Sequence, residues 1–395
     1  MQLRTKSTKT VLAVLAVFGM VTAAACGGSS LGGGSSDDAI EGEVKIGLLV
    51  PQSGVYKPLG DDMKNAFELY LDQNDGKLGG HDVDLRIADE GETPETGRSA
   101  ATKLLEQDDV LAVSGVVNSA VMNSVKDMFE SNEVPLVGSN ASPTTLTDVD
   151  YIWRTSYVND EPGKALGEWV ANNIDGPVYL IAADYQAGED EIEGFKETFE
   201  PAGGEIAGEI YTPFPDTTNF QPYLSKIRKA DAAAAFTFYA GGAAVDFVKQ
   251  YDKFGLADDV PLYGAGFLTE GGVLDAQAQA AEGVFTSMNY SASLENELNT
   301  EFVEAYEKAH GNPPTTYAVA SYDAAHVLDK AIEDAGDGLT SQTLKEAIDS
   351  IGDIESPRGT WKFNDNGTPI QTWYLREVQD GENVAIDELG TVGDK

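Results

Sequence analysis

Cysteine is almost absent from this 395-residue chain, and basic residues are scarce. Cys26 is the sole cysteine, so the fold cannot depend on disulfide bonds and no cluster of thiolates can hold a metal. Lysine and arginine number 26 against 66 aspartates and glutamates, which gives a formal net charge of −40. A strongly negative protein repels the phosphate backbone, so nucleic-acid binding is not expected.

Long apolar runs are also lacking, because the run at 11–21 is too short to span a membrane. It is preceded by three basic residues and followed by Ala23-Ala24-Ala25-Cys26-Gly27. This layout resembles a bacterial lipoprotein signal, in which the cysteine is acylated and becomes the first residue of the mature protein. An ordinary signal peptide with a stray cysteine is the alternative. We therefore expect residues 1–25 to be a signal peptide and the exported protein to be anchored to the outer face of the cytoplasmic membrane through lipidated Cys26.

The remaining chain is too long for one hydrophobic core. Without the signal it has 370 residues, and a chain of that length usually folds as two or more domains. Residues 26–42 have the Gly/Ser/Asp composition of a flexible tether. We predict a first lobe of 43–158 plus about 290–350, a second lobe of 159–289 plus about 351–385, and a tail at 386–395.

Strands and helices alternate along both predicted lobes. Apolar runs such as LAVSGVV and VYLIAA are typical of strands that are buried on both faces. The pattern predicts an α/β fold with two doubly wound parallel-sheet lobes joined by a multi-strand hinge. Helices are expected at 61–74 and, late in the chain, at 296–310, 317–335 and 341–351, before a β-hairpin at 359–378 that turns at Asn366-Gly367.

Several segments, in their order, resemble the leucine/isoleucine/valine-binding family of type I periplasmic binding proteins. They include VKIGLLVPQSGVYKPLGDDMKNAFELYL near the start, SAVMNSVKDMFESNEVPLVGSNASPTTLT in the middle and SYDAAHVLDKAIEDAG late in the chain. The resemblance covers nearly the whole mature chain. It implies a two-lobed protein that closes on one small molecule and delivers it to the permease and ATPase subunits of an ABC importer.

Loops that follow strands are the places to search for a ligand site, because ligands of open α/β sheets lie beyond the carboxyl ends of the strands. Ser119 follows such a strand and opens a helix, where free backbone amides favour a carboxylate. It also matches the family's ligand-binding serine, although a plain helix N-cap would explain it too. The resemblance further implies that Asn140, Ala141 and Ser142 hold the polar head of the ligand, where a turn before a proline is the alternative.

Three tyrosines could form aromatic walls of the same site. Tyr185 and Tyr239 stand at the carboxyl ends of predicted strands of the second lobe, and Tyr56 lies in a loop of the first. Core packing is the rival explanation for Tyr185 and Tyr239, and simple exposure is the rival for Tyr56.

The chain departs from the family where amino-acid binders usually place an acid that balances the ligand's ammonium. The segment Gly264-Ala265-Gly266-Phe267 has none, and Phe267 suggests an apolar contact instead. Either Glu270 or Asp160 substitutes, or the ligand lacks an ammonium. The candidate ligands are therefore branched-chain or other amino acids, aromatic or aliphatic carboxylic acids, and amides.

Other functions have little support in the sequence. No G-x-S-x-G motif occurs and histidines are few, so no enzyme activity and no catalytic residue are expected. No cofactor or metal site is expected either, and the acidic run from Glu189 to Glu193 is interpreted as a solvent-facing helix start. A ligand-sensing receptor component with the same fold is the alternative to an importer subunit.

Overall fold

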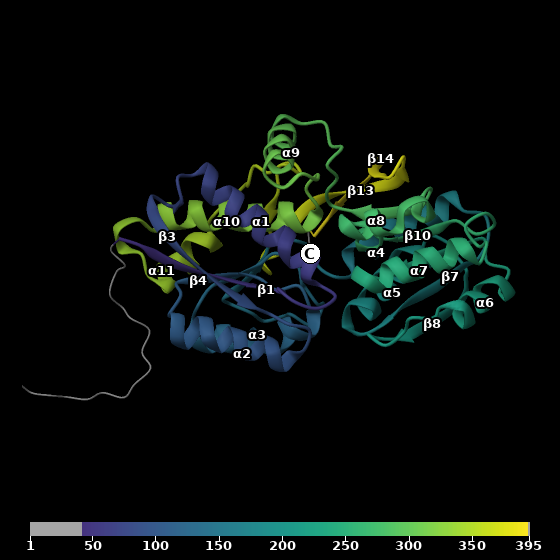
Figure 1. Ribbon diagram of the computed structural model, residues 1–395, viewed down its shortest axis with the longest axis horizontal. Helices are drawn as coiled ribbons and strands as arrows, with labels where there is room; N and C mark the ends of the chain where they lie inside the picture. The colour runs from purple at the N-terminus through teal and green to yellow at the C-terminus, as the bar shows by residue number, and fades with distance from the viewer. Residues whose placement is uncertain (1–41, 394–395) are drawn as a thin grey trace, which may run out of the picture. The chain divides into compact units, whose positions relative to one another are not determined.

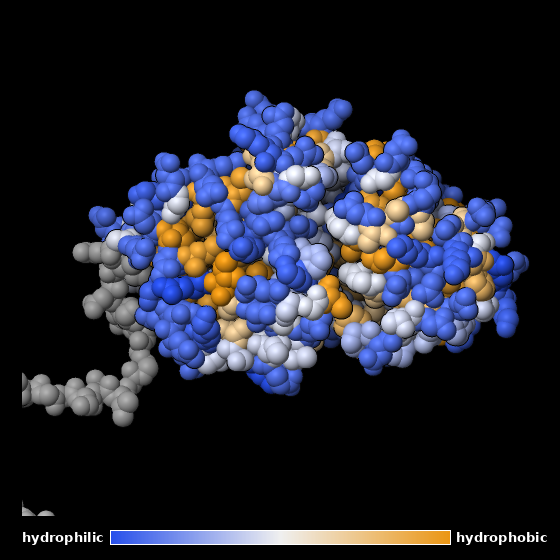
Figure 2. All heavy atoms as spheres, in the orientation of Figure 1, coloured by the Kyte–Doolittle hydropathy of each residue, from blue (hydrophilic) through white to orange (hydrophobic). Residues whose placement is uncertain are grey.

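The computed structural model describes residues 42–393 (Figure 1). The predicted signal peptide, Cys26 and tether residues 27–41 lie outside them. None of the helices in the described range has the length and apolarity needed to cross a bilayer. Figure 2 shows a largely hydrophilic face, in keeping with the excess of acidic residues. The predicted α/β class is confirmed, since two mainly parallel sheets each carry helices on both faces.

The first sheet has the strand order β2-β3-β1-β4-β5-β6, and all its pairings except β2–β3 are parallel. Successive side chains of the central strand point to opposite faces. Ile46 and Leu48 join the core that includes α1 and α10, whereas Leu49 packs with α2 and α3. The elements are β1 (Val44–Val50), α1 (Lys57–Gln73), β2 (Lys77–Leu78), β3 (His81–Asp89), α2 (Pro94–Thr102), β4 (Ala112–Gly115), α3 (Ser119–Asn132), β5 (Leu136–Gly138), β6 (Ile152–Arg154), α10 (Thr316–Ala335) and α11 (Ser341–Asp349).

The second sheet has the order β12-β13-β11-β10-β9-β7-β8, with β14 paired to β13. One face is covered by α4 and α5 and the other by α6, α7 and α8. The elements are α4 (Glu161–Asn173), β7 (Val178–Asp184), α5 (Gln186–Phe199), β8 (Ile206–Pro213), α6 (Gln221–Lys229), β9 (Ala234–Phe238), α7 (Gly241–Lys253), β10 (Leu262–Ala265), α8 (Gly272–Gln277), β11 (Phe285–Met288), β12 (Lys362–Phe363), β13 (Pro369–Gln379) and β14 (Glu382–Val392).

The chain crosses between the sheets after β6, after β11 and between α11 and β12; α9 (Glu297–His310) follows the second crossing. These connections meet at one buried atom, the carbonyl oxygen of Ser156. It accepts hydrogen bonds from Asn289 Nδ2 at 2.8 Å, Gln371 Nε2 at 2.7 Å and Arg358 Nη1 at 3.2 Å. The crossing segments are thus tied together where the hinge was predicted.

Two boundaries differ from the predictions. Helix α1 begins at Lys57 rather than 61, because Pro58 fits the first turn of a helix. The predicted hairpin is confirmed by β12 and β13, but the expected tail at 386–395 is wrong, since Ile386 to Val392 belong to β14. The connection between β13 and β14 contains Asp380-Gly381, both with positive φ, which is the dipeptide signal of a tight hairpin turn.

Candidate ligand-binding site

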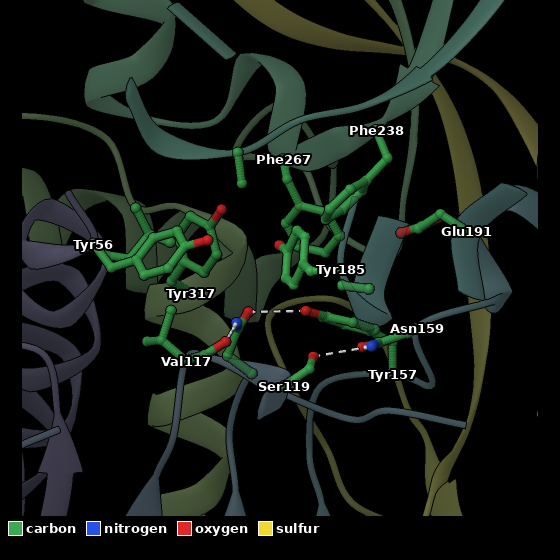
Figure 3. A pocket seen from close by; sticks show the side chains of 14 residues that line it. Tyr56, Val117, Ser119, Tyr157, Asn159, Tyr185, Glu191, Phe238, Phe267 and Tyr317 are labelled. Atoms are coloured by element: carbon green, nitrogen blue, oxygen red, sulfur yellow. Dashed lines mark hydrogen bonds between the residues drawn. The ribbon is translucent and has the colours of Figure 1, made fainter. Parts of the chain in front are cut away.

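A cavity lies where the carboxyl ends of strands from both sheets come together (Figure 3). Its walls come from the first lobe, from the segment after β6 and from the second lobe. The lining residues are Tyr56, Leu59, Val117, Ser119, Asn140, Tyr157, Asn159, Tyr185, Ala187, Glu191, Phe238, Ala240, Phe267 and Tyr317. Five of the predicted ligand-binding residues are among them: Tyr56, Ser119, Asn140, Tyr185 and Phe267.

Ser119 faces the cavity and does not cap its helix. The N-cap of α3 is Asn118, whose Oδ1 accepts from the amides of Ala120 and Val121 at 2.8 and 3.3 Å. The Ser119 hydroxyl instead accepts from Asn159 Nδ2 at 3.0 Å (Figure 3). The N-cap explanation of Ser119 is therefore wrong, and its hydroxyl oxygen lies at the cavity wall.

The backbone amides at the start of α3 are largely occupied, contrary to the expectation that they are free. A buried carboxylate, Glu90, accepts from the amides of Val117 and Asn118 at 2.8 Å each. Burial raises the pKa of Glu90 to about 8 despite these two bonds. The amide of Ser119, the first of α3, has no acceptor among the described residues, so an anion at this helix start would depend on Ser119, through its amide and its hydroxyl.

Of the segment Asn140-Ala141-Ser142, the structure brings only Asn140 to the cavity. Asn140 Nδ2 donates to the Val117 carbonyl at 3.0 Å, and its Oδ1 accepts from the Tyr157 hydroxyl at 3.0 Å. The Ala141 amide is already bonded to the Val116 carbonyl at 2.8 Å, and that of Ser142 donates to Asn159 Oδ1 at 3.3 Å. Neither Ala141 nor Ser142 lines the cavity: Ala141 packs in a core of the first lobe, and Ser142 is buried with a hydroxyl oxygen that has no partner among the described residues.

Aromatic rings form most of the remaining wall. Phe267 lies within ring-contact distance of Tyr157, Phe238 and Tyr317, at 5.1, 5.8 and 6.1 Å between centroids. Tyr56 is only 4% exposed, so its interpretation as an exposed loop residue is wrong. The ring of Phe214 lies between those of Tyr56 and Tyr185, with centroids 6.4 Å from Tyr56 and 4.4 Å from Tyr185. This stack of three rings joins the two lobes at the cavity edge.

Tyr239 does not reach the cavity. It is buried in a separate core, where its hydroxyl lies 3.0 Å from Thr212 Oγ1 and its ring packs on Phe220 and Phe247. Phe238, one residue earlier, lines the cavity instead. Neighbouring residues of a strand point to opposite faces, so placing the site one residue too late selected the wrong face.

Neither acid expected to replace the missing counter-ion is available. Glu270 is held by the Arg376 guanidinium at 2.8 Å and by the Thr316 amide, and Asp160 pairs with Lys164 at 2.7 Å. Neither lines the cavity. Both carboxylates are therefore parts of the scaffold.

Glu191 is the acid that does line the cavity, and its interpretation as a solvent-facing residue is wrong. Its side chain is buried, its Oε2 accepts from the Gly163 amide at 3.1 Å, and burial raises its pKa well above the usual value. The helical period indicates this burial, since Glu191 lies four residues from both Ala187 and Phe195, which are on the buried face of α5. A Cβ on Gly163 would stand 2.4 Å from the Glu191 carbonyl oxygen, so glycine is what lets α4 approach α5 here.

Two polar atoms of the cavity wall have no hydrogen-bond partner within the described residues: Glu191 Oε1 and Tyr317 Oη. Burial raises the pKa of Tyr317 well above its usual value, so its hydroxyl stays a donor. Buried polar groups normally have partners, and leaving one without costs about 1–3 kcal/mol. In the described part of the chain, no group of His, Cys, Asp and Glu side chains is arranged to hold a metal ion.

Comparison with known proteins places this geometry in a family. Residues 43–383 match the family described as periplasmic binding protein. A Leu/Ile/Val-binding protein homolog from Brucella melitensis is 28% identical over 377 residues, which cover 94% of this chain and 93% of the relative. These matches extend over nearly all the described residues.

Two solved structures are similar in both fold and sequence. A solute-binding protein of an ABC transporter from R. palustris, in complex with benzoate, is 32% identical with a TM-score of 0.85 and covers 90% of this chain and 98% of its own. Another from Rhodopseudomonas palustris BisB5, in complex with 3,4-dihydroxybenzoic acid, is 29% identical with a TM-score of 0.84 and the same coverage. The chain therefore belongs to the periplasmic binding protein family and is a solute-binding protein of the ABC-transporter type, not an enzyme.

Proposed function

We propose that this chain captures a small aromatic carboxylic acid between its two lobes and delivers it to the permease of an ABC importer. The observation that carries this proposal is the wall of six aromatic rings, contributed by both lobes and the segment between them: Tyr56, Tyr157, Tyr185, Phe238, Phe267 and Tyr317. Rings favour a flat apolar ligand, since they offer large contact area with few rotatable bonds. The benzoate and dihydroxybenzoic acid in the two R. palustris relatives support the same class.

An α-amino acid fits this cavity less well. Its ammonium would need an ionised counter-ion, and Phe267 stands where the family's acid is expected. Glu270 and Asp160 have partners elsewhere, and burial favours the neutral form of Glu191. A ring acid needs no such counter-ion.

The carboxylate of the ligand would be held by neutral donors. Within residues 42–393, no lysine, arginine or histidine lines the cavity, whereas the hydroxyls of Ser119 and Tyr317 both belong to its wall. Hydrogen bonds from hydroxyls to a charged group are stronger than those between neutral groups. We assign the polar head of the ligand to Ser119 and Tyr317, with Asn140 beside them.

Closure would occur about the crossing segments that meet at Ser156, with each lobe supplying one wall. Export and anchoring through lipidated Cys26 remain part of the proposal. They would keep the protein beside its permease, since two acyl chains form a stable membrane anchor.

A ligand panel tests the proposal. We expect benzoate to raise the melting temperature and to bind in calorimetry, while leucine, isoleucine and valine do neither. Stabilisation by the branched-chain amino acids alone would refute it.

Ser119→Ala tests the assignment of the carboxylate. Loss of a hydrogen bond to a charged group should weaken benzoate binding by roughly tenfold to a hundredfold with little change in stability. Ser124→Ala is the matched control, because this serine lies on the same helix, bonds to the Val121 carbonyl and does not line the cavity. Unchanged affinity in Ser119→Ala would remove Ser119 from the site.

A further inference from the structure

We propose that Glu191 selects ligands that carry a hydroxyl on the aromatic ring, by pairing its Oε1 with that hydroxyl. This inference rests on the proposed function and adds a specificity determinant to it. Glu191 lies on α5, whereas Ser119, which we assign to the ligand's carboxylate, lies on α3, so the two residues line different sides of the cavity.

The position of the Glu191 carboxyl is fixed by its surroundings. The side chain is 1% exposed, and the bond from the Gly163 amide to Oε2 holds one oxygen against the first turn of α4. The other oxygen has no partner among the described residues. Figure 3 shows this carboxyl directed toward the rings of Tyr185 and Phe238. A ligand lying among these rings would place a substituent next to Oε1.

The charges near Glu191 exclude a ligand carboxylate as its partner. Asp160 and Asp190, together with Glu161, are the acids whose charges act on Glu191. Lys164 is near, but it is already paired with Asp160 and Glu197. A ligand carboxylate placed here would be repelled by Asp160 and Asp190 even with Glu191 in its neutral form, so it belongs at the other end of the cavity.

A hydroxyl also fits better than an ammonium. Burial and the neighbouring acids favour the neutral form of the Glu191 carboxyl, and a neutral carboxyl pairs with a hydroxyl without a charge to compensate. Asp190 does not compete for the position, because its carboxylate is occupied by Thr144, Asn159 and Gln186. Glu191 is the acid of this cluster that reaches the cavity.

Calorimetry with benzoate and its 2-, 3- and 4-hydroxy derivatives tests the inference on the unmodified protein. We expect at least one hydroxybenzoate to bind about tenfold tighter than benzoate, the ratio that one additional hydrogen bond gives. Equal affinities for all four would overturn the role of Glu191 and leave the proposed function standing. If no benzoate binds, the proposed function itself fails.

Variants then assign the preference to the residue. Glu191→Leu should abolish the preference for the hydroxybenzoate while benzoate still binds, and Glu191→Gln, which keeps a polar group, should retain part of it. Glu189→Gln is the control, because Glu189 lies on the exposed side of the same helix. A preference that survives in Glu191→Leu would refute the inference. The inference would also be refuted if the unmodified protein bound leucine and the Glu191→Gln variant did not, since Glu191 would then be the counter-ion of the ligand's ammonium.

Discussion

Asp323 is the residue whose removal should most clearly expose how the crossing segments are held. It is fully buried on α10, with Oδ2 at 3.0 Å from Arg358 Nε, and it accepts hydrogen bonds from Ser356 Oγ at 2.9 Å and Trp361 Nε1 at 3.0 Å. Arg358 in turn donates to the Ser156 carbonyl and to Gln371. Asp323 thus ties the last crossing segment to the first lobe.

The expected cost of Asp323→Ala is large because it leaves a buried guanidinium without its counter-ion. Removing one partner of a buried ion pair costs about 3–5 kcal/mol of unfolding free energy. The cation–π contact of Arg358 with Trp361, at 4.6 Å, remains but does not neutralise the charge. Replacing both partners should cost much less, so the double variant Asp323→Ala/Arg358→Leu is expected to recover most of the loss.

Equilibrium urea unfolding, followed by tryptophan fluorescence, measures these differences. Asp349→Ala is the control, since Asp349 forms an exposed pair with Lys345 at 2.7 Å and such pairs contribute about 0–1 kcal/mol. A loss in Asp323→Ala no greater than that in Asp349→Ala would refute the reasoning. A double variant less stable than Asp323→Ala would do so as well.

Two further predictions concern pH and the faces of β9. Burial raises the pKa of Glu90 from 4.5 to about 8, so the folded state keeps a proton that the unfolded chain has released. The unfolding free energy should therefore fall as pH rises from about 5 to 8, and Glu90→Gln should flatten this dependence in urea titrations; an unchanged slope would assign it to other groups. Phe238→Ala should weaken benzoate binding at least about tenfold, since burial of apolar surface drives such contacts. Tyr239→Phe should leave benzoate binding unchanged and lower the unfolding free energy by about 1 kcal/mol, the value of one hydrogen bond. The opposite pattern in calorimetry would mean that Tyr239, not Phe238, faces the ligand.

The fold was largely predictable because its signals are local. Buried strands followed by helices set the two parallel sheets, and the Asn366-Gly367 turn set the hairpin of β12 and β13. The last strand escaped prediction because its exposed face carries acids, which obscure the alternation of a half-buried strand. Its Asp380-Gly381 turn was nevertheless visible in the sequence.

The site was predictable in place but only partly in detail. Ser119 follows a strand, and the rule that ligands lie beyond carboxyl ends located it, whereas Phe267 was identified through the family resemblance, at the position where an acid is usual. Tyr157 follows the carboxyl end of β6, so the strand-end rule could have found it, whereas Tyr317 comes from the start of α10, where that rule does not apply. Their approach to the cavity depends on how distant segments pack.

The sequence by itself determined the α/β class and the two parallel-sheet lobes, because these follow from the periodicity of apolar residues. The family resemblance added that the usual acid is missing at Phe267. Only the tertiary structure decided which side chains share the cavity. It placed Tyr239 in a core and Phe238 in the cavity wall, and it made Asn118 rather than Ser119 the N-cap of α3. It also buried Glu191 with one oxygen that has no partner in the described part of the chain. The physical reason is that hydrogen bonding and exposure of a side chain depend on neighbours far away in the chain, which no local pattern encodes.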